Sequence, residues 1–382
     1  MTDLIKTASQ RLDAWIEREQ FKGWDPYDAL NSPLLKALTF GQRRIGQVWV
    51  QVMKRSPVNL RPLLGVPKGY NPKGMGLFLA SYWRKYQQTG SQAHLEKVRF
   101  FYDWLRANAS PGYQGACWGY NFDWPNRGFF APAGTPTVVN TSFIALALLD
   151  VVPQFPAALD LAVSACQFFQ HDLNHLRPRP DELCFSYTPL DERYIHNANI
   201  LAAQVLAQVG QLQADPQLKE MAWQSARYTV HHQREDGSWL YGEGERDQWV
   251  DNFHTGFVLV ALRDIARSLE TAEFDTAVHA GYAYWKQHFF LPDGTPKYYA
   301  DKLYPIDIHA VAQAVLTFLA FADVDDEAAL WARKVAAWGI RQMQDSSGYF
   351  HFQIYGRYRS RVPYMRWCQA WMQRALTELE IA

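Results

Sequence analysis

The sequence predicts an all-α fold: a closed α/α toroid, or barrel, of about six to seven helical hairpins with short β-segments at the cavity mouth. Three observations predict it. An aromatic-x-Tyr motif recurs about every 55 residues, an apolar helix pattern follows each copy, and a second helix with a polar face precedes the next copy. Closing such hairpins into a ring buries both flanks of every inner helix, whereas an open end exposes an apolar face.

The aromatic motif sets the register of this repeat. We expect each block to run as a glycine turn, a short strand, a polar loop, an inner helix, a linker and an outer helix. The first residues of the five copies are separated by 67, 54, 57 and 54 positions. The copies are Trp118-Gly119-Tyr120, Phe185-Ser186-Tyr187, Trp239-Leu240-Tyr241, Pro296-Lys297-Tyr298 and Phe350-His351-Phe352.

Inner and outer helices are predicted to alternate along the chain. Apolar residues at i, i+3, i+4 and i+7 indicate inner helices that start near Asn140, His196, His254, His309 and Arg366. The stretches 155–171, 215–232, 272–289 and 326–343 have a polar face suited to the outside.

The N-terminal part follows the same scheme less regularly. We expect helices over 28–40, 45–53 and 75–88, which raises the count to about seven hairpins in one domain spanning 1–382. An open α-solenoid is the simpler alternative, but its repeats are usually shorter and have no strand between their helices.

Composition excludes several classes of protein. Lys plus Arg equals Asp plus Glu, 38 against 38, so no global field favours nucleic acid or an anionic membrane. The N-terminus reads as an amphipathic helix instead of a signal peptide, and no apolar run is long enough to span a membrane, so we expect a cytoplasmic protein. The four cysteines form no ligand pair, so we expect reduced thiols, no metal and no cofactor.

The loops before the inner helices should gather at one mouth, where helix N-termini offer free N–H groups. Aromatic rings with carboxylates and amides between them suit a sugar, whose C–H faces pack on rings while its hydroxyls need polar partners. The candidate binding residues are Trp24, Asp25, Tyr27, Asp28, Trp118, Tyr120, Asp123, Asn140, Tyr187, Asn197, Trp239, Tyr241 and Tyr298.

Three histidines, His196, His254 and His309, fall in the first turn of successive inner helices. A helix N-terminus keeps imidazole neutral near pH 7, as a general base requires, and a nearby carboxylate such as Asp251 can orient the ring. A cap or a satisfied buried histidine is the alternative for each one. We single out His254 with Asp251 as the catalytic candidates, ahead of His196 and His309.

Arginines and further carboxylates leave other options open. Near the C-terminus Arg357, Arg361 and Arg366 lie among tyrosines, and two guanidiniums pointing inward would clamp a carboxylate or phosphate. Asp25, Asp28, Asp123 and Asp251 could instead supply the two carboxylates of glycoside cleavage, although Asp before a helix is more often an N-cap.

Two other motifs are set aside. The run 323–326 matches the DxDD pattern of terpene cyclases, but it falls at the C-terminal end of a predicted inner helix, away from the aromatic loops. Cys117 and Cys184 occupy one repeat position, which explains them without zinc.

The runs DGSWLYGE (236–243), WVDNFHTGFVLVAL (249–262) and GWDPYDALNSPLL (23–35) resemble a family of toroid proteins encoded in bacterial exopolysaccharide and cell-surface polysaccharide clusters. More distantly, the layout is similar to N-acylglucosamine 2-epimerases, unsaturated glucuronyl hydrolases and the helical domain of glucuronyl C5-epimerases. The resemblance implies proton exchange by two histidines in the first of these and hydration assisted by two aspartates in the second.

Our preferred hypothesis is an enzyme acting on a sugar or uronate-containing glycan in polysaccharide biosynthesis, by acid–base chemistry centred on His254 and Asp251. Epimerisation, hydrolysis and β-elimination remain open. A non-catalytic glycan-binding or assembly protein is the second hypothesis. The third is an isoprenoid-handling toroid, against which the polar mouth argues. The expected partner is a carbohydrate, and the sequence does not predict the oligomeric state.

Overall fold

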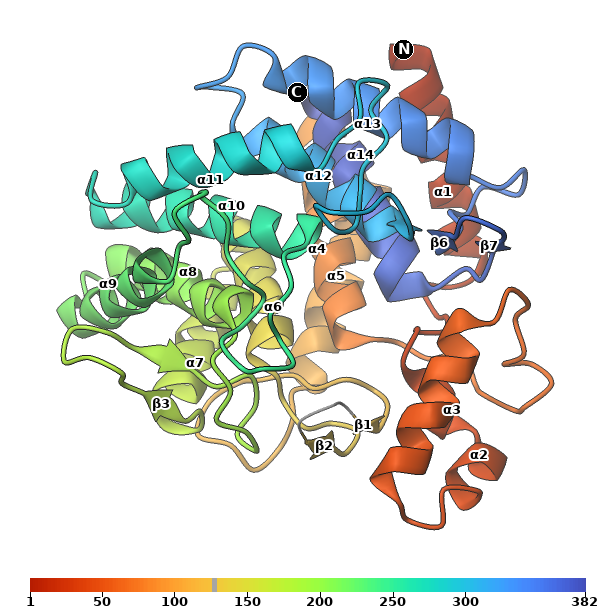
Figure 1. The fold of residues 1–382 in the computed structure, drawn as a ribbon, viewed down its shortest axis with the longest axis horizontal. Coiled ribbons are helices and arrows are strands. Elements are labelled where there is room, and N and C mark those ends of the chain that lie inside the picture. Colours follow the sequence, from red (N-terminus) through yellow and green to blue (C-terminus); the bar gives the residue numbers. More distant parts are fainter. Residues whose placement is uncertain (126–128) are drawn as a thin grey trace.

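The computed structural model describes residues 1–125 and 129–382, and helices supply nearly all of their regular structure (Figure 1). Six inner helices pack side by side in a ring, and α14 packs on α4 to close it. The inner helices are α4 (Pro72–Thr89), α6 (Val138–Val151), α8 (His196–Leu212), α10 (Asn252–Leu269), α12 (Ile308–Ala320) and α14 (Trp371–Ile381). The outer helices are α1 (Thr2–Arg18), α5 (Gln92–Ala107), α7 (Ala158–His171), α9 (Pro216–His231), α11 (Asp275–His288) and α13 (Ala328–Met343).

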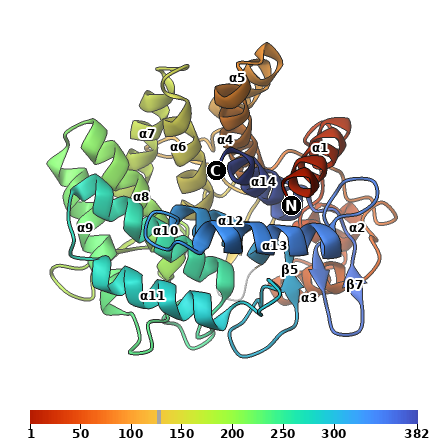
Figure 2. The ribbon, with the colours of Figure 1, turned by 90° about the horizontal axis from the view of Figure 1, so that it is seen from above.

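The predicted toroid is therefore confirmed, with six hairpins among the residues that the structure describes. Five are consecutive in sequence, and the sixth pairs the C-terminal inner helix α14 with the N-terminal outer helix α1 (Figure 2). Both ends of the chain thus complete the same hairpin. Among the described residues, no helix has the length and apolar character needed to cross a bilayer.

Burial distinguishes the two layers. Inner helix α8 buries 14 of its 17 residues, whereas outer helix α9 buries seven of its 16. The expected start near His196 is the first residue of α8, and α6, α10 and α12 begin within two residues of their predicted starts, whereas α4 begins three residues before the predicted position 75 and α14 five residues after Arg366. Helix α14 follows a π-helical turn, η2 (Met365–Ala370), that carries Arg366.

Residues 28–66 form a small unit beside the ring instead of a seventh hairpin (Figure 1). The helix predicted over 28–40 is interrupted, because Ser32 caps a new helix that begins with Pro33. The unit contains η1 (Asp28–Asn31), α2 (Pro33–Ala37) and α3 (Arg43–Arg55). Its separate core consists of Ala29, Leu35, Val50, Met53 and Val66.

The strands are short and lie at the mouth. Two antiparallel pairs and one three-stranded sheet are present in the described part of the chain. They comprise β1 (Trp124–Pro125) with β2 (Phe130–Ala131), β3 (His175–Leu176) with β4 (Cys184–Phe185), and β5 (Ile306–Asp307) with β6 (Gln353–Ile354) and β7 (Arg359–Ser360).

A repeated backbone bond explains why the aromatic motif recurs. The first N–H of α8 donates to the carbonyl of Tyr241, which precedes the next inner helix, at 3.1 Å. Helices α6, α10 and α12 make the same bond to Tyr187, Tyr298 and Phe352 at 2.9, 3.0 and 3.2 Å. Met365 N, at the start of η2, reaches Trp24 O at 3.0 Å and joins the last repeat to the first segment. The motif thus links neighbouring repeats around the ring.

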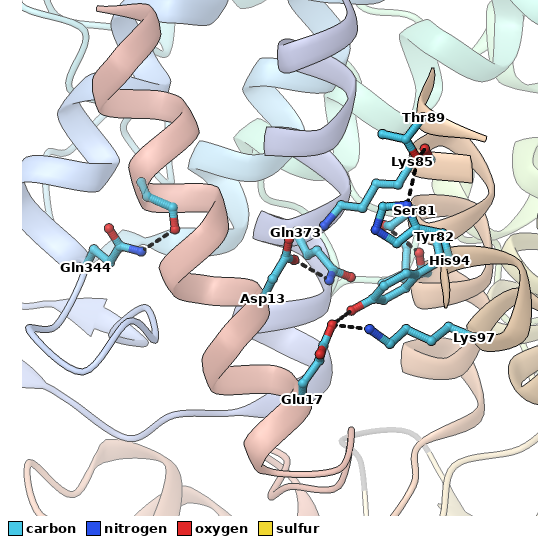
Figure 3. Close-up of polar contacts among 12 residues, drawn as sticks. Asp13, Glu17, Ser81, Tyr82, Lys85, Thr89, His94, Lys97, Gln344 and Gln373 are labelled. Carbon is cyan, nitrogen blue, oxygen red and sulfur yellow. Dashed lines mark hydrogen bonds and ion pairs between the residues drawn. The ribbon is translucent and has the colours of Figure 1, made fainter. Parts of the chain in front are cut away.

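Polar contacts join α1 to the ring (Figure 3). Asp13 pairs with Lys85 of α4 and accepts a hydrogen bond from Gln373 of α14 at 2.7 Å. Glu17 pairs with Lys97 of α5 and accepts from the Tyr82 hydroxyl at 2.9 Å. One helix thus bridges both ends of the chain.

Asp13→Ala is expected to lower the free energy of unfolding by about 1–3 kcal/mol, because the largely buried Lys85 loses its carboxylate. Urea denaturation measures it. Asp3→Ala, in the exposed first turn of the same helix, is the control, with an expected change within about 0.5 kcal/mol. Equal effects of the two substitutions would contradict a closing role for this contact.

Candidate active site

The N-terminal ends of the inner helices meet at one end of the barrel, where the aromatic motifs also lie, of which only the Phe185 copy includes a regular strand, β4. Helical spacing fixes which first-turn residues share the axial face, since positions three or four apart lie one above the other. Asn140 precedes Phe143 by three, and Lys73, Asn197 and His309 each precede a cavity-lining residue by four. We therefore place these four polar groups toward the barrel axis.

Three aromatic rings from alternate inner helices divide the interior. Phe143, Phe257 and Trp371 lie with ring centroids 5.1 to 5.4 Å apart. The ammonium of Lys73 lies 4.2 Å from the Phe143 ring centroid and 5.1 Å from that of Trp371. The three rings also line a cavity of about 450 Å³ that extends to the C-terminal ends of the inner helices.

This lower cavity was not predicted from the sequence. Below the three rings its walls combine aliphatic with polar side chains, and several of the polar ones pair with one another. Arg84 forms a bidentate pair with Glu378, and Gln204 donates to Asp264 at 2.6 Å. None of the described residues that line it is a histidine, and the candidate acid–base groups lie on the other side of the aromatic rings.

A buried ion pair joins the first and last segments of the chain at the mouth. Arg366 donates to both carboxylate oxygens of Asp25, at 2.6 and 2.9 Å. Asp28 accepts from Arg61 at 2.7 Å, and burial raises the pKa of Asp28 to about 6. Tyr120 lies under the Arg366 guanidinium and shares a hydrogen bond with Tyr187.

Lys73 is a functional candidate that the sequence analysis missed. It is the second residue of α4, the same first-turn position that His309 occupies in α12, and this parallel was the available signal. Burial lowers the pKa of Lys73 well below its ordinary value, and the charge of Arg366 lowers it further. Within the described residues its Nζ has aromatic neighbours but no hydrogen-bond acceptor. A buried amine in this state suits contact with a ligand oxygen.

Lys73→Met is expected to raise the free energy of unfolding at pH 7 by about 1–3 kcal/mol, because it removes the cost of desolvating an ammonium. The folded-state pKa is depressed, so this cost declines as pH rises from the folded pKa toward about 10.4, the unfolded value. Urea titrations at pH 7 and 9.5 should show the advantage of the variant shrinking. An unchanged or lower stability at pH 7 would contradict the account.

His254 is oriented by Asp251. The Asp251 carboxylate lies 2.7 Å from Nδ1 of His254, accepts its backbone N–H at 3.0 Å and accepts the Trp249 indole N–H at 2.8 Å. A proton on Nδ1 satisfies this carboxylate and leaves Nε2 as an acceptor. The Tyr241 ring packs against the rings of both Trp249 and His254, with its centroid 4.4 Å from that of Trp249 and 4.6 Å from that of His254. The imidazole is therefore oriented so that its Nε2 can accept a proton.

His309 lies deeper and has a different environment. Both of its ring nitrogens are buried without a hydrogen-bond partner among the described residues. Burial lowers its pKa well below the ordinary value, and the charges of Lys73 and Arg366 lower it further. The Phe253 ring lies 4.6 Å from His309 and 4.2 Å from His254, so the two imidazoles lie within about 9 Å of each other. His309 is thus a neutral imidazole with two open nitrogens.

Two amides join Lys73 and His309 on the mouth side of the three aromatic rings. Asn140 is fully buried with neither amide atom bonded, and Asn197 is 3% exposed with its Oδ1 unbonded, within the part of the chain that the structure describes. Leaving such groups unpaired costs about 1–3 kcal/mol each, so native structures normally satisfy them with water or ligand. The unpaired amides and imidazole mark a place for a hydroxyl-bearing ligand.

Several predicted residues lie in the walls instead. The Trp118 and Trp239 indoles donate to carbonyls of outer helices, Leu105 O at 3.0 Å and Thr229 O at 2.8 Å. Gly281 of α11 makes room for the Trp239 ring. His196 bonds Glu243 at 2.6 Å and stacks on Tyr228 of outer helix α9, so its ring is turned away from the axis.

Other predicted residues support loops. Asp123 pairs with Lys36, and the Trp24 indole donates to Val66 O at 2.9 Å. Tyr27 accepts from Lys54 at 2.8 Å, while its ring faces Trp367 at the mouth. The Tyr298 ring packs edge-on against Phe253, the ring that contacts both imidazoles, with 5.4 Å between the ring centroids.

Of the three predicted C-terminal arginines, Arg366 alone is buried. Arg357 and Arg361 are exposed, so the expected clamp of two guanidiniums is not formed. The DxDD run lies between α12 and α13, where Asp323 pairs with Arg263 and Arg267 and Asp325 pairs with Lys286. The four cysteines are buried and unpaired.

Comparison with known proteins establishes the fold. No family model matches the chain, and no curated protein matches it by sequence. Among solved structures it is similar to cellobiose 2-epimerase from Bacillus thermoamylovorans, with 12% identity, a TM-score of 0.65, and 83% and 90% of the two chains covered.

Two further neighbours have the same architecture. A D-mannose isomerase is 10% identical with a TM-score of 0.62, over 81% and 86% of the chains. The unsaturated glucuronyl hydrolase of a Bacillus species is 15% identical with a TM-score of 0.59, over 80% and 85%. The chain thus shares the α/α toroid of enzymes that process carbohydrates.

Proposed function

We propose that the protein is a carbohydrate-active enzyme that moves a proton at the carbon beside a sugar carbonyl, as an epimerase or isomerase does. The observation that carries this proposal is the pair of imidazoles that both contact Phe253, each with a ring nitrogen that has no hydrogen-bond partner among the described residues. The names of the cellobiose 2-epimerase and the mannose isomerase support the same reaction class.

His254 acts as the base in this mechanism. Its Nε2 takes the proton from the carbon next to the carbonyl, while Asp251 stabilises the imidazolium that forms. As the carbon loses its proton, negative charge develops on the carbonyl oxygen. Lys73 and Arg366 lie near enough to His309 for their charges to lower its pKa, and they can stabilise that oxyanion.

His309 acts on the other face of the substrate. A neutral imidazole first takes a proton from a sugar hydroxyl, and the imidazolium so formed then returns that proton to carbon, while the proton that His254 removed goes back to the oxygen. The unpaired amides of Asn140 and Asn197 hold the remaining hydroxyls. Delivery of the proton to the same carbon gives an epimer, and delivery to its neighbour gives an isomer.

Glycoside hydrolysis fits the carboxylates less well, since it requires two that are free to act. Asp25 is clamped by Arg366, and Asp251 bonds His254 and Trp249. Burial raises the pKa of Asp307 to about 6, as a general acid needs, but its oxygens already accept from Trp367, Gln353 and the His309 backbone.

The second candidate is a glycan-binding or assembly protein without catalysis. The unpaired amides of Asn140 and Asn197 favour it as much as they favour an enzyme, because a bound sugar alone would satisfy them. Under either candidate, we propose a role in bacterial exopolysaccharide or cell-surface polysaccharide biosynthesis, in the cytoplasm, by a single domain spanning 1–382.

The test is proton NMR of the protein with free hexoses, N-acetylhexosamines and uronate-containing oligosaccharides. We expect new anomeric signals of an epimer or isomer, with the number of reducing ends unchanged. A rise in reducing ends would establish a hydrolase, and a vinyl proton would establish an eliminating enzyme. Line broadening without conversion for every sugar would support the binding protein.

A further inference from the structure

The segment 33–66, which contains α2 and α3, has an unusual charge and is called the basic module below. The whole chain is balanced, with 38 basic and 38 acidic residues, but the module has no Asp or Glu. Its basic residues are Lys36, Arg43, Arg44, Lys54, Arg55 and Arg61. The balanced total charge of the chain therefore conceals a local excess of positive charge in this module.

The same module exposes apolar side chains to an unusual degree. Of the 17 large hydrophobic residues exposed in the described chain, seven fall within its 34 residues. Concentrated apolar exposure beside cations marks an interaction surface, whereas scattered exposed residues need no explanation. The seven are Leu34, Leu38, Phe40, Val48, Val52, Val58 and Leu63.

Helix α3 shows how the two properties are combined. Gly46, Val50 and Met53 face the small core of the unit. The opposite side exposes Val48 and Val52, which are 57% and 47% exposed. Arg44 and Arg55 lie four residues before Val48 and three after Val52, so the four form one exposed stripe of a basic amphipathic helix.

A groove runs along this stripe and gains a third guanidinium from a distant loop. Arg246, between α9 and α10, lines it together with Arg44, Arg55 and the two valines. Within residues 1–125 and 129–382, none of the three arginines has a carboxylate partner. Of the acids around Arg246, Glu243 bonds His196 and Asp247 bonds Arg193, which leaves Glu245 as the one exposed acidic neighbour.

We propose that the basic module docks on an anionic phospholipid surface. The arginines would contact lipid phosphates, while Val48 and Val52 enter the boundary between headgroups and acyl chains. A second copy of the chain fits poorly, because a symmetric contact through this stripe would bring arginines against arginines. The proposal is independent of the reaction performed at the barrel mouth.

The test is co-sedimentation of the full chain with vesicles of phosphatidylcholine alone or with 40% phosphatidylglycerol, in 0.1 M and 0.5 M salt. We expect binding to the anionic vesicles, little to the neutral ones, and loss in 0.5 M salt, where charges are screened beyond about 4 Å. Inorganic phosphate at 10 mM should not release the protein. Equal binding to both vesicles, no binding to either, or release by phosphate would overturn the proposal.

Variants locate the surface. Arg44→Gln/Arg55→Gln should weaken partitioning roughly 10- to 30-fold, and Val48→Ser/Val52→Ser should weaken it severalfold. The matched control is Leu330→Ser/Arg341→Gln on exposed positions of α13, which should bind as wild type does. Equal losses in the control would overturn the assignment. Binding to polyglutamate but not to vesicles would also overturn it. A dimer that forms as the protein concentration rises and is abolished by Arg44→Gln/Arg55→Gln would do the same. The salt and lipid dependence of the wild type tests the proposal even if a variant fails to fold.

Discussion

His254→Gln should reduce turnover of the substrate sugar by about 10²- to 10⁴-fold, the usual contribution of a positioned acid–base group. The glutamine keeps a hydrogen-bonding side chain near Asp251 but has no basic nitrogen. Binding should persist, because the proposed contacts of Lys73, Asn140 and Asn197 with the sugar remain. Initial rates from NMR, with binding followed by calorimetry, measure both effects.

His279→Gln is the matched control for this substitution. His279 is an exposed histidine on outer helix α11, far from the imidazole pair in the fold, and its variant should turn over sugar as the wild type does. A His254→Gln enzyme with undiminished turnover would contradict the assignment of the base.

The second large effect is expected for Arg366→Ala, which should lower the free energy of unfolding by about 3–5 kcal/mol. Asp25 is 3% exposed, and its carboxylate would be left buried without its counter-charge. Urea denaturation at pH 7 measures the loss. Arg357→Ala, at an exposed position in the same C-terminal region, should stay within about 0.5 kcal/mol of the wild type.

The double variant Asp25→Asn/Arg366→Met separates the ion pair from the packing. Removing both charges should recover much of the stability, because the cost comes from an unpaired buried charge. If the double variant is as unstable as the sum of both single ones, the pair contributes through shape and the electrostatic account fails.

The repeat was the part of the fold most open to prediction from sequence. Apolar periodicity located α6, α8, α10 and α12 within two residues of their starts, since a helix buried on most sides leaves a strong pattern. The 28–40 segment was misjudged because its apolar residues continue through Pro33, where a 3₁₀ turn ends and a new helix begins. Ring closure depends on contacts between the two ends of the chain, which no local pattern records.

The candidate site was predicted less completely. The first-turn histidines were identifiable because they recur at the same position of successive repeats. Lys73 occupies that position too, but it was missed because it is a different residue type. Trp118 and Trp239 have the same sequence context as mouth residues. Their rings face outward, where the indole N–H groups donate to carbonyls of the outer helices α5 and α9. The lower cavity depends on how six helices pack. The spacing of residues along the sequence therefore did not predict that three aromatic rings would separate it from the mouth.

Incubation in deuterated water tests the central claim most directly. With a sugar that the protein converts, we predict deuterium at the carbon beside the carbonyl, incorporated by wild type and nearly absent with His254→Gln. This result would show that the mouth imidazoles exchange a carbon-bound proton. Conversion without deuterium at that carbon, or equal incorporation by both proteins, would contradict it.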